Sequence, residues 1–142
     1  MKMKTPTVLA CLLAFVLFTG CAPVSTQPGK SATHVYTPAK GTPERTAILA
    51  GVRAALDQQG LKNVVLLVPS LKVHNGWAWI QVNPQSADGK NHYESQSGLL
   101  REKAKKWTLL EWMPSEEGTD YAKYFHDLRA KYPAAPADIF PK

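Results

Sequence analysis

The sequence predicts one small α+β domain over residues 43–142, in which an antiparallel sheet of about four strands lies between an N-terminal and a C-terminal helix. Three observations predict this fold class. Apolar residues recur at helical spacing near both ends of the segment, β-rich runs fill its middle, and Asn75-Gly76 separates two of these runs. The expected order of elements is therefore helix, four strands, helix.

The first helix is expected to begin at Thr42-Pro43-Glu44. Threonine can cap a helix, proline suits the first helical position, and an acid in the first turn complements the helix dipole. Gly60 is a typical residue just beyond a helix C-terminus. The apolar stripe between these ends consists of Ile48, Val52, Ala55 and Leu56.

The first hairpin joins the β-rich runs 64–73 and 77–82 through Asn75-Gly76, two residues that accept positive φ. Pro69 cannot donate to a strand ladder, so it marks a bulge or a sheet edge. A two-residue turn also fixes the register, which assigns the side chains to two faces. The aliphatic face carries Leu71, Val73, Ala78, Ile80 and Val82. The opposite face carries Ser70, Lys72, His74, Trp77, Trp79 and Gln81.

A polar loop at 83–94 leads to a second expected hairpin, with strands at 95–101 and 107–113 around a charged turn at 102–106. Both helices are expected to cover one face of the resulting sheet.

The last helix is expected to start at Thr119 or Asp120 and to end before Pro133. Its apolar stripe consists of Tyr121, Tyr124, Phe125, Leu128 and Tyr132. The tail 134–142 contains Ile139-Phe140, a pair that we expect to cover an edge of the core.

The first 20 residues read as a cleaved signal peptide. Lys2 and Lys4 give a positive start, and the apolar run 8–18 is too short to span a bilayer as a helix. Ordinary secretory cleavage is an alternative, but Pro23 would follow that cut and block it. An uncleaved anchor is a further alternative, which the length of the run disfavours.

The segment Phe18-Thr19-Gly20-Cys21 resembles the lipobox of bacterial lipoproteins, with Phe18 where that family usually has leucine. The resemblance covers about the first 22 residues. It implies that residues 1–20 are removed and that Cys21 becomes a lipidated N-terminus, anchored in the lipid bilayer. Because Ala22 stands where an aspartate would retain the protein at the inner membrane, the resemblance implies the periplasmic face of the outer membrane.

Residues 21–42 then form the lipidated cysteine and a tether rich in proline, glycine, serine and threonine. The alternative is that Val35 and Tyr36 dock on the domain as an edge strand. Removal of two leader lysines lowers the net charge from +6 to about +4. The positive residues are scattered apart from Lys103, Lys105 and Lys106, so the sequence does not predict a nucleic-acid partner.

The composition offers little catalytic chemistry. Cys11 leaves with the leader and Cys21 takes the lipid, so the domain has no thiol for a disulfide, a metal or nucleophilic catalysis. The four histidines show no metal-ligand spacing, and the sequence contains no nucleotide or hydrolase motif. We therefore expect neither a catalytic residue, a metal nor a cofactor.

The sheet face with Lys72, His74, Trp77 and Trp79 is the candidate binding surface, since indoles stack on ligands and the polar pair adds contacts. The alternative is that a helix or the tail covers both indoles. A catalytic alternative places His74, His126 or Glu111 in a cleft of the sheet. Glu111 is otherwise expected to pair with Arg101 across the second hairpin.

A second resemblance covers about residues 44–140, to a group of small exported bacterial domains of unknown function. Its short motifs are Arg45-x-Ala47-Ile48-Leu49 with Arg53, Leu71-x-Val73, Trp77-Ala78-x-Ile80, Leu99-Leu100-Arg101, Trp107 and Asp120. The resemblance implies no activity. We expect a membrane-anchored, non-enzymatic binding or scaffolding domain whose partner is an envelope protein, an exported toxin or peptidoglycan. The alternatives are a small periplasmic enzyme and a purely structural lipoprotein.

Overall fold

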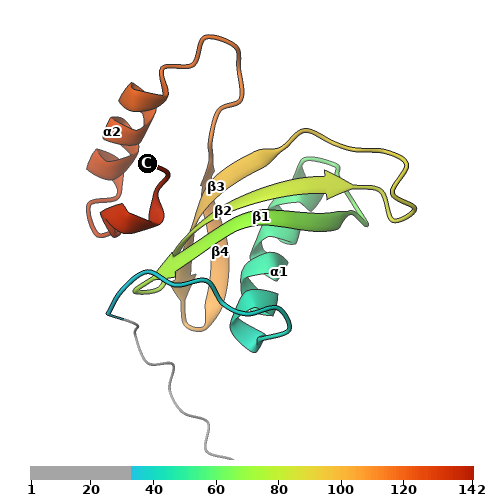
Figure 1. Cartoon of the computed structure of the whole chain (residues 1–142), viewed down its shortest axis with the longest axis horizontal. Helices are drawn as coiled ribbons and strands as arrows, with labels where there is room; N and C mark the ends of the chain where they lie inside the picture. Colours follow the sequence, from blue (N-terminus) through green and yellow to red (C-terminus); the bar gives the residue numbers. More distant parts are fainter. Residues whose placement is uncertain (1–32) are drawn as a thin grey trace, which may run out of the picture.

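The computed structural model describes residues 33–142 and confirms the α+β order with four antiparallel strands between two helices (Figure 1). The elements are α1 (Pro43–Gln58), β1 (Val65–His74), β2 (Trp77–Gln85), β3 (Gln96–Lys103), β4 (Lys106–Trp112) and α2 (Tyr121–Lys131), with a 3₁₀ turn, η1, at Ala137–Ile139. The strands lie in the order β1-β2-β3-β4. The leader, Cys21 and the tether up to residue 32 lie outside the described residues.

Helix α1 begins and ends where its sequence predicts. The Thr42 hydroxyl oxygen accepts a hydrogen bond from the Arg45 amide at 3.3 Å. Past the C-terminus Gly60 adopts φ +86°, and the Leu61 amide donates to the Leu56 carbonyl at 3.0 Å, as in a Schellman motif. No helix within residues 33–142 is long and apolar enough to cross a bilayer.

The first hairpin has the predicted turn and register. Asn75 and Gly76 have φ values of 50° and 70°, and His74 lies opposite Trp77. The pairing shifts between Leu67 and Ser70, on either side of Pro69. Pro69 therefore occupies a bulge on an edge strand, which is where a residue without an amide proton is tolerated.

The second hairpin turns more tightly than expected. Its strands extend to Lys103 and start again at Lys106, so the turn consists of Ala104 and Lys105 alone. These residues have φ values of 51° and 61°, in the left-handed region that favours glycine and asparagine. A two-residue turn could not be predicted here because neither residue is one that such turns prefer.

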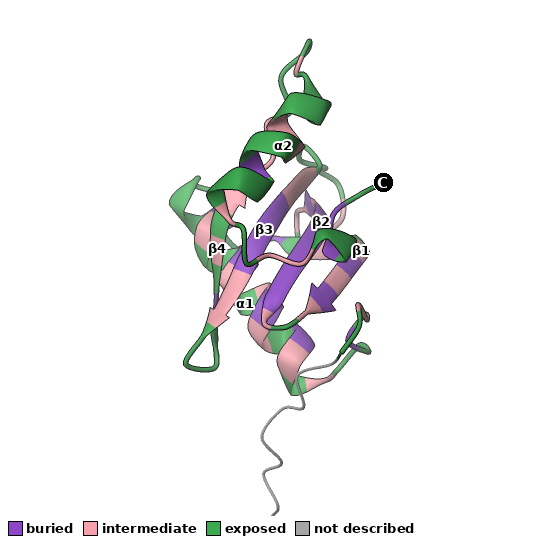
Figure 2. Cartoon of the chain, turned by 90° about the vertical axis from the view of Figure 1, so that its left-hand side faces the viewer, coloured by how far each residue is buried: buried purple, intermediate pink, exposed green. Residues whose placement is uncertain are grey.

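The two helices cover opposite faces of the sheet, which corrects the expectation that they share one face (Figure 2). The stripe of α1 packs on the aliphatic face around Ala78 and Ile80. Helix α2 and the tail pack on the other face, against Trp77 and Trp79. Both faces of the sheet carry apolar side chains, so each face has to be packed against its own helix.

The folded domain starts earlier than residue 43. Tyr36 pairs with Val73 through two backbone hydrogen bonds of 3.0 and 2.8 Å, and the Thr37 hydroxyl donates to the Leu71 carbonyl at 2.7 Å. The buried Arg45 guanidinium donates to the Pro38 carbonyl at 3.0 Å. The structure therefore shows the alternative for Tyr36, which pairs with β1 ahead of the boundary expected at residue 43.

Candidate functional site

Both candidate indoles are covered. Trp77 is 7% exposed and Trp79 is 3% exposed. The rings of Phe125 and Phe140 meet Trp79 edge-on at centroid distances of 5.4 and 5.5 Å. The Arg101 guanidinium lies 4.6 Å from the Trp77 ring. The structure therefore shows the alternative in which α2 and the tail cover both indoles, because burying two such large side chains stabilises the fold.

The two polar members of the candidate surface hold the C-terminal tail. His74 Nδ1 lies 2.8 and 3.0 Å from the two carboxylate oxygens of Asp138. The Lys72 ammonium donates to the Phe140 carbonyl at 3.4 Å. The structure therefore brings all four predicted residues together, and they pack against or bind the C-terminal tail.

Beside these four residues lies a shallow hollow of about 550 Å³, which we call the tail hollow. It is lined by residues 35–37, Lys72, Arg129 and tail residues 137, 138 and 140–142. Val35, Phe140 and Pro141 make its walls apolar. Lys72, Arg129 and Lys142 bring cations to it, and the carboxylate of Asp138, which pairs with His74, also lines it. Apolar walls with a few charged groups are typical of binding sites.

The tail hollow escaped sequence reasoning because it joins segments from both ends of the domain. Its N-terminal wall comes from residues assigned to the tether, and its other wall is the tail. The one available signal was Val35-Tyr36, an apolar pair within an otherwise polar stretch.

Glu111 is not paired with Arg101. The register places Glu111 opposite Leu99 and Arg101 opposite Thr108, with an irregularity between the two pairs. Glu111 instead accepts hydrogen bonds from the Lys131 ammonium at 2.6 Å and from the hydroxyl of Tyr132, the residue just after α2, at 3.4 Å. The carboxylate therefore links β4 to α2.

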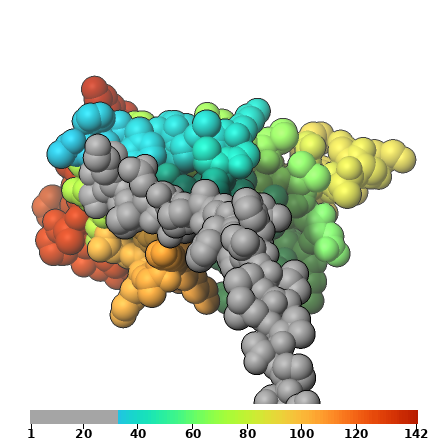
Figure 3. Space-filling view, turned by 90° about the horizontal axis from the view of Figure 1, so that it is seen from below, coloured from blue at the N-terminus to red at the C-terminus, as the bar shows by residue number. Residues whose placement is uncertain are grey.

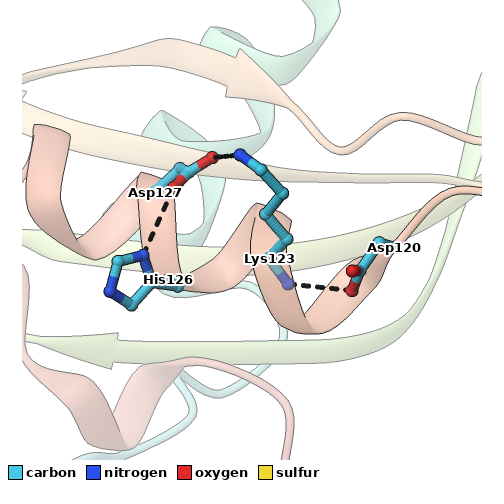
Figure 4. Close-up of polar contacts among 4 residues, drawn as sticks. All are labelled: Asp120, Lys123, His126 and Asp127. Carbon is cyan, nitrogen blue, oxygen red and sulfur yellow. Dashed lines mark hydrogen bonds and ion pairs between the residues drawn. The ribbon is translucent and has the colours of Figure 1, made fainter.

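His126 projects from the outer surface of α2, where its side chain is 82% exposed. Its Nδ1 lies 3.2 Å from a carboxylate oxygen of Asp127, which also accepts a hydrogen bond from the Lys123 ammonium. Asp120 caps the helix by accepting from the Lys123 amide at 3.0 Å, and these contacts are drawn in Figure 4. These contacts join neighbours on one exposed helix surface. His74, Glu111 and His126 thus lie on three different elements, and each has its own partners.

Two tyrosines have perturbed acidity. Burial, followed by the hydrogen bond to Glu44 at 2.6 Å, raises the pKa of Tyr36. Burial, followed by the negative charge of Glu111, raises the pKa of Tyr124 to about 12. The Tyr124 hydroxyl has no hydrogen-bond partner among residues 33–142. Both phenols therefore stay protonated near neutral pH, as structural groups.

Comparison of this chain with protein-family models, with curated proteins and with solved structures finds no match. Within residues 33–142, no three histidine, cysteine, aspartate or glutamate side chains lie close enough together to hold a metal ion. The tail hollow is therefore described by its geometry alone, and it is the candidate site.

Proposed function

We propose that this protein is an exported lipoprotein, acylated at Cys21, whose small domain binds a partner in the cell envelope and does no chemistry. The observation that carries the proposal is the pairing of Tyr36 with Val73. It ties the start of the fold to the sheet only 15 residue steps after Cys21, which is at most about 54 Å of chain. A domain held that close to a bilayer suits a partner that is fixed in the envelope.

The tail hollow is the proposed binding surface. Lys72 and Arg129 favour a partner that presents a carboxylate, and the apolar wall favours an aliphatic group beside it. Envelope proteins, exported toxins and peptidoglycan stem peptides all offer that combination. The catalytic alternative draws no support from the positions of His74, His126 and Glu111, which have separate partners.

The anchor is tested by intact-mass measurement of the protein purified from its own envelope. The expected mass is that of a chain starting at Cys21 with fatty acids attached. Cys21→Ser is expected to leave an unprocessed precursor with no label from radioactive palmitate. A native chain that keeps its first methionine, or has a bare Cys21 thiol, contradicts the anchor.

The binding surface is tested by crosslinking in cells and purification of the tagged protein. Lys72→Glu with Arg129→Glu is expected to abolish the enrichment of a partner by introducing repulsion at the hollow. Lys62→Glu with Lys90→Glu is the matched control, because it makes the same charge change on exposed residues that do not line the hollow. If the wild-type protein enriches no partner, or both double variants enrich the same one, the proposal fails.

A further inference from the structure

Three exposed lysines crowd the end of the second hairpin, Lys103, Lys105 and Lys106, which we call the lysine tip. Within the part of the chain that the structure describes, none of their ammonium groups lies within 4.0 Å of a carboxylate. The tip therefore presents three cations to solvent, and nothing in the fold uses their charge.

The local sequence of the tip works against the stability of the hairpin. Lys103 and Lys106 lie directly opposite each other, and like charges in that position are destabilising. Ala104 and Lys105 both adopt positive φ, which costs a non-glycine residue of order 1 kcal/mol. Strained, charged positions of this kind are concentrated at functional sites, and here they place positive charge at the outermost point of the sheet.

The lysine tip lies at the end of the sheet from which the chain leads back toward Cys21. Because Tyr36 pairs antiparallel with Val73, the residues before Tyr36 run toward the Asn75-Gly76 turn. The two hairpin turns are neighbours, since the Glu102 amide donates to the Gly76 carbonyl at 2.8 Å. Figure 1 shows both turns, and the blue segment that leads into α1, at the lower end of the sheet.

Figure 3 views this end directly and shows segments 33–45, in blue and cyan, and the second hairpin, in orange, on the same side of the molecule (Figure 3). The carboxylates of Glu44, Glu102 and Asp138 lie near this end, bonded to the Tyr36 hydroxyl, beside the glycine of the first turn and beside His74, respectively. The three lysines of the tip and Arg101, which donates to the Asn75 carbonyl at 2.9 Å, outnumber these three carboxylates. The formal charge of these groups is therefore positive.

We propose that the lysine tip docks on the anionic phospholipid headgroups of the membrane that holds Cys21, and so fixes which end of the domain faces the bilayer. This inference rests on the proposed function for its membrane, and its occupant is a lipid surface. Two arguments select that occupant. The proposed acyl group at Cys21 lies at most about 54 Å of chain from Tyr36, and the tip carries the complementary charge.

The test uses the chain from residue 21 with Cys21→Ser, so that no acyl group contributes, and measures co-sedimentation with phosphatidylethanolamine vesicles containing one quarter phosphatidylglycerol. A lysine near such a surface changes the partition coefficient about fivefold. Lys103→Gln, Lys105→Gln and Lys106→Gln together are therefore expected to weaken partition about a hundredfold. Pure phosphatidylcholine vesicles are expected to bind neither protein, and binding is expected to fall steeply above 0.3 M salt, an estimate from charge screening.

The matched control is Lys62→Gln, Lys90→Gln and Lys123→Gln, which removes the same charge from exposed residues away from the tip. Partition of this control is expected to change less than threefold, because only diffuse attraction is lost. The tip variant is expected to unfold at the same urea concentration as the wild type or a higher one, since it removes the facing pair of like charges. A loss of binding then cannot come from loss of the fold.

Equal vesicle binding by the tip variant and the wild type overturns the proposal, as does an equal loss in both triple variants. Failure of the wild type to bind anionic vesicles also overturns it, even if the protein binds an anionic polymer instead. The anchor is judged separately, by the mass of the native Cys21 terminus. A native Cys21 terminus without fatty acids, together with vesicle binding that depends on the lysine tip, would contradict the anchor and still support the affinity of the tip for anionic lipid.

Discussion

Replacing Gly51 by alanine should destabilise the domain, although Gly51 lies inside α1, where alanine is normally favoured by about 1 kcal/mol. A Cβ at this position would lie 2.5 Å from the Trp107 carbonyl oxygen and 3.0 Å from its carbonyl carbon. That oxygen belongs to the backbone of β4, so it cannot rotate away. The new methyl group falls about 0.9 Å short of an ordinary contact distance, and α1 has to move off the sheet by most of that amount.

The cost follows from what α1 buries. Ile48, Val52 and Leu56 are fully buried between α1 and the sheet, and overpacking of such an interface costs about 1–3 kcal/mol. Because the clash is with backbone atoms, we take the upper part of this range, about 2–3 kcal/mol. After the gain of about 1 kcal/mol in helix propensity, we expect Gly51→Ala to lower the free energy of unfolding by about 1–2 kcal/mol, or the Tm by about 4–16 °C. Urea unfolding followed by tryptophan fluorescence measures this change.

Ala50→Gly is the matched control at the neighbouring, exposed position of α1. Helix propensity alone gives these two substitutions opposite signs, with Gly51→Ala stabilising. The close approach of α1 to β4 makes both destabilising. A Gly51→Ala protein as stable as the wild type, or more stable, would refute the reasoning.

Three further predictions concern the tyrosines and the tail. Tyr36→Phe should lower the free energy of unfolding, measured by urea titration, by about 1–2 kcal/mol because it deletes a hydrogen bond to the carboxylate of Glu44. Tyr124→Phe should leave the free energy of unfolding equal or higher, because the Tyr124 hydroxyl has no hydrogen-bond partner among the described residues. The pKa of Tyr124 is raised to about 12 from the ordinary 10.0, so the folded protein keeps this proton at pH values where the unfolded chain loses it. The free energy of unfolding is therefore unaffected by this group below pH 10 and falls between pH 10 and pH 12. The prediction is contradicted if the urea midpoint of Tyr124→Phe falls as steeply over this range as that of the wild type. Phe140→Ala should cost about 3 kcal/mol and shift the tryptophan emission to the red by admitting water to Trp79, and an unchanged spectrum would show that the tail is not its cover.

The sequence by itself determined the elements and the pairing of the first hairpin. Thr42, Gly60 and Asp120 act through atoms three to five residues away, so their effect is visible in a short window. Asn75-Gly76 set the register of β1 and β2 because only residues that tolerate positive φ close a two-residue turn. The same rule did not predict the second turn, where Ala104 and Lys105 adopt positive φ although neither is a glycine or an asparagine.

Only the tertiary structure decided which surfaces remain open. The cover over Trp79 comes from Phe140, 61 positions further along the chain, and the partner of Glu111 comes from α2 rather than from its own hairpin. Tyr36 pairs with β1 through hydrogen bonds that any backbone can make, so the apolar pair Val35-Tyr36 suggested this placement only as an alternative. Local signals specify what each segment becomes, whereas burial and pairing between distant segments depend on how the whole chain fills its two cores.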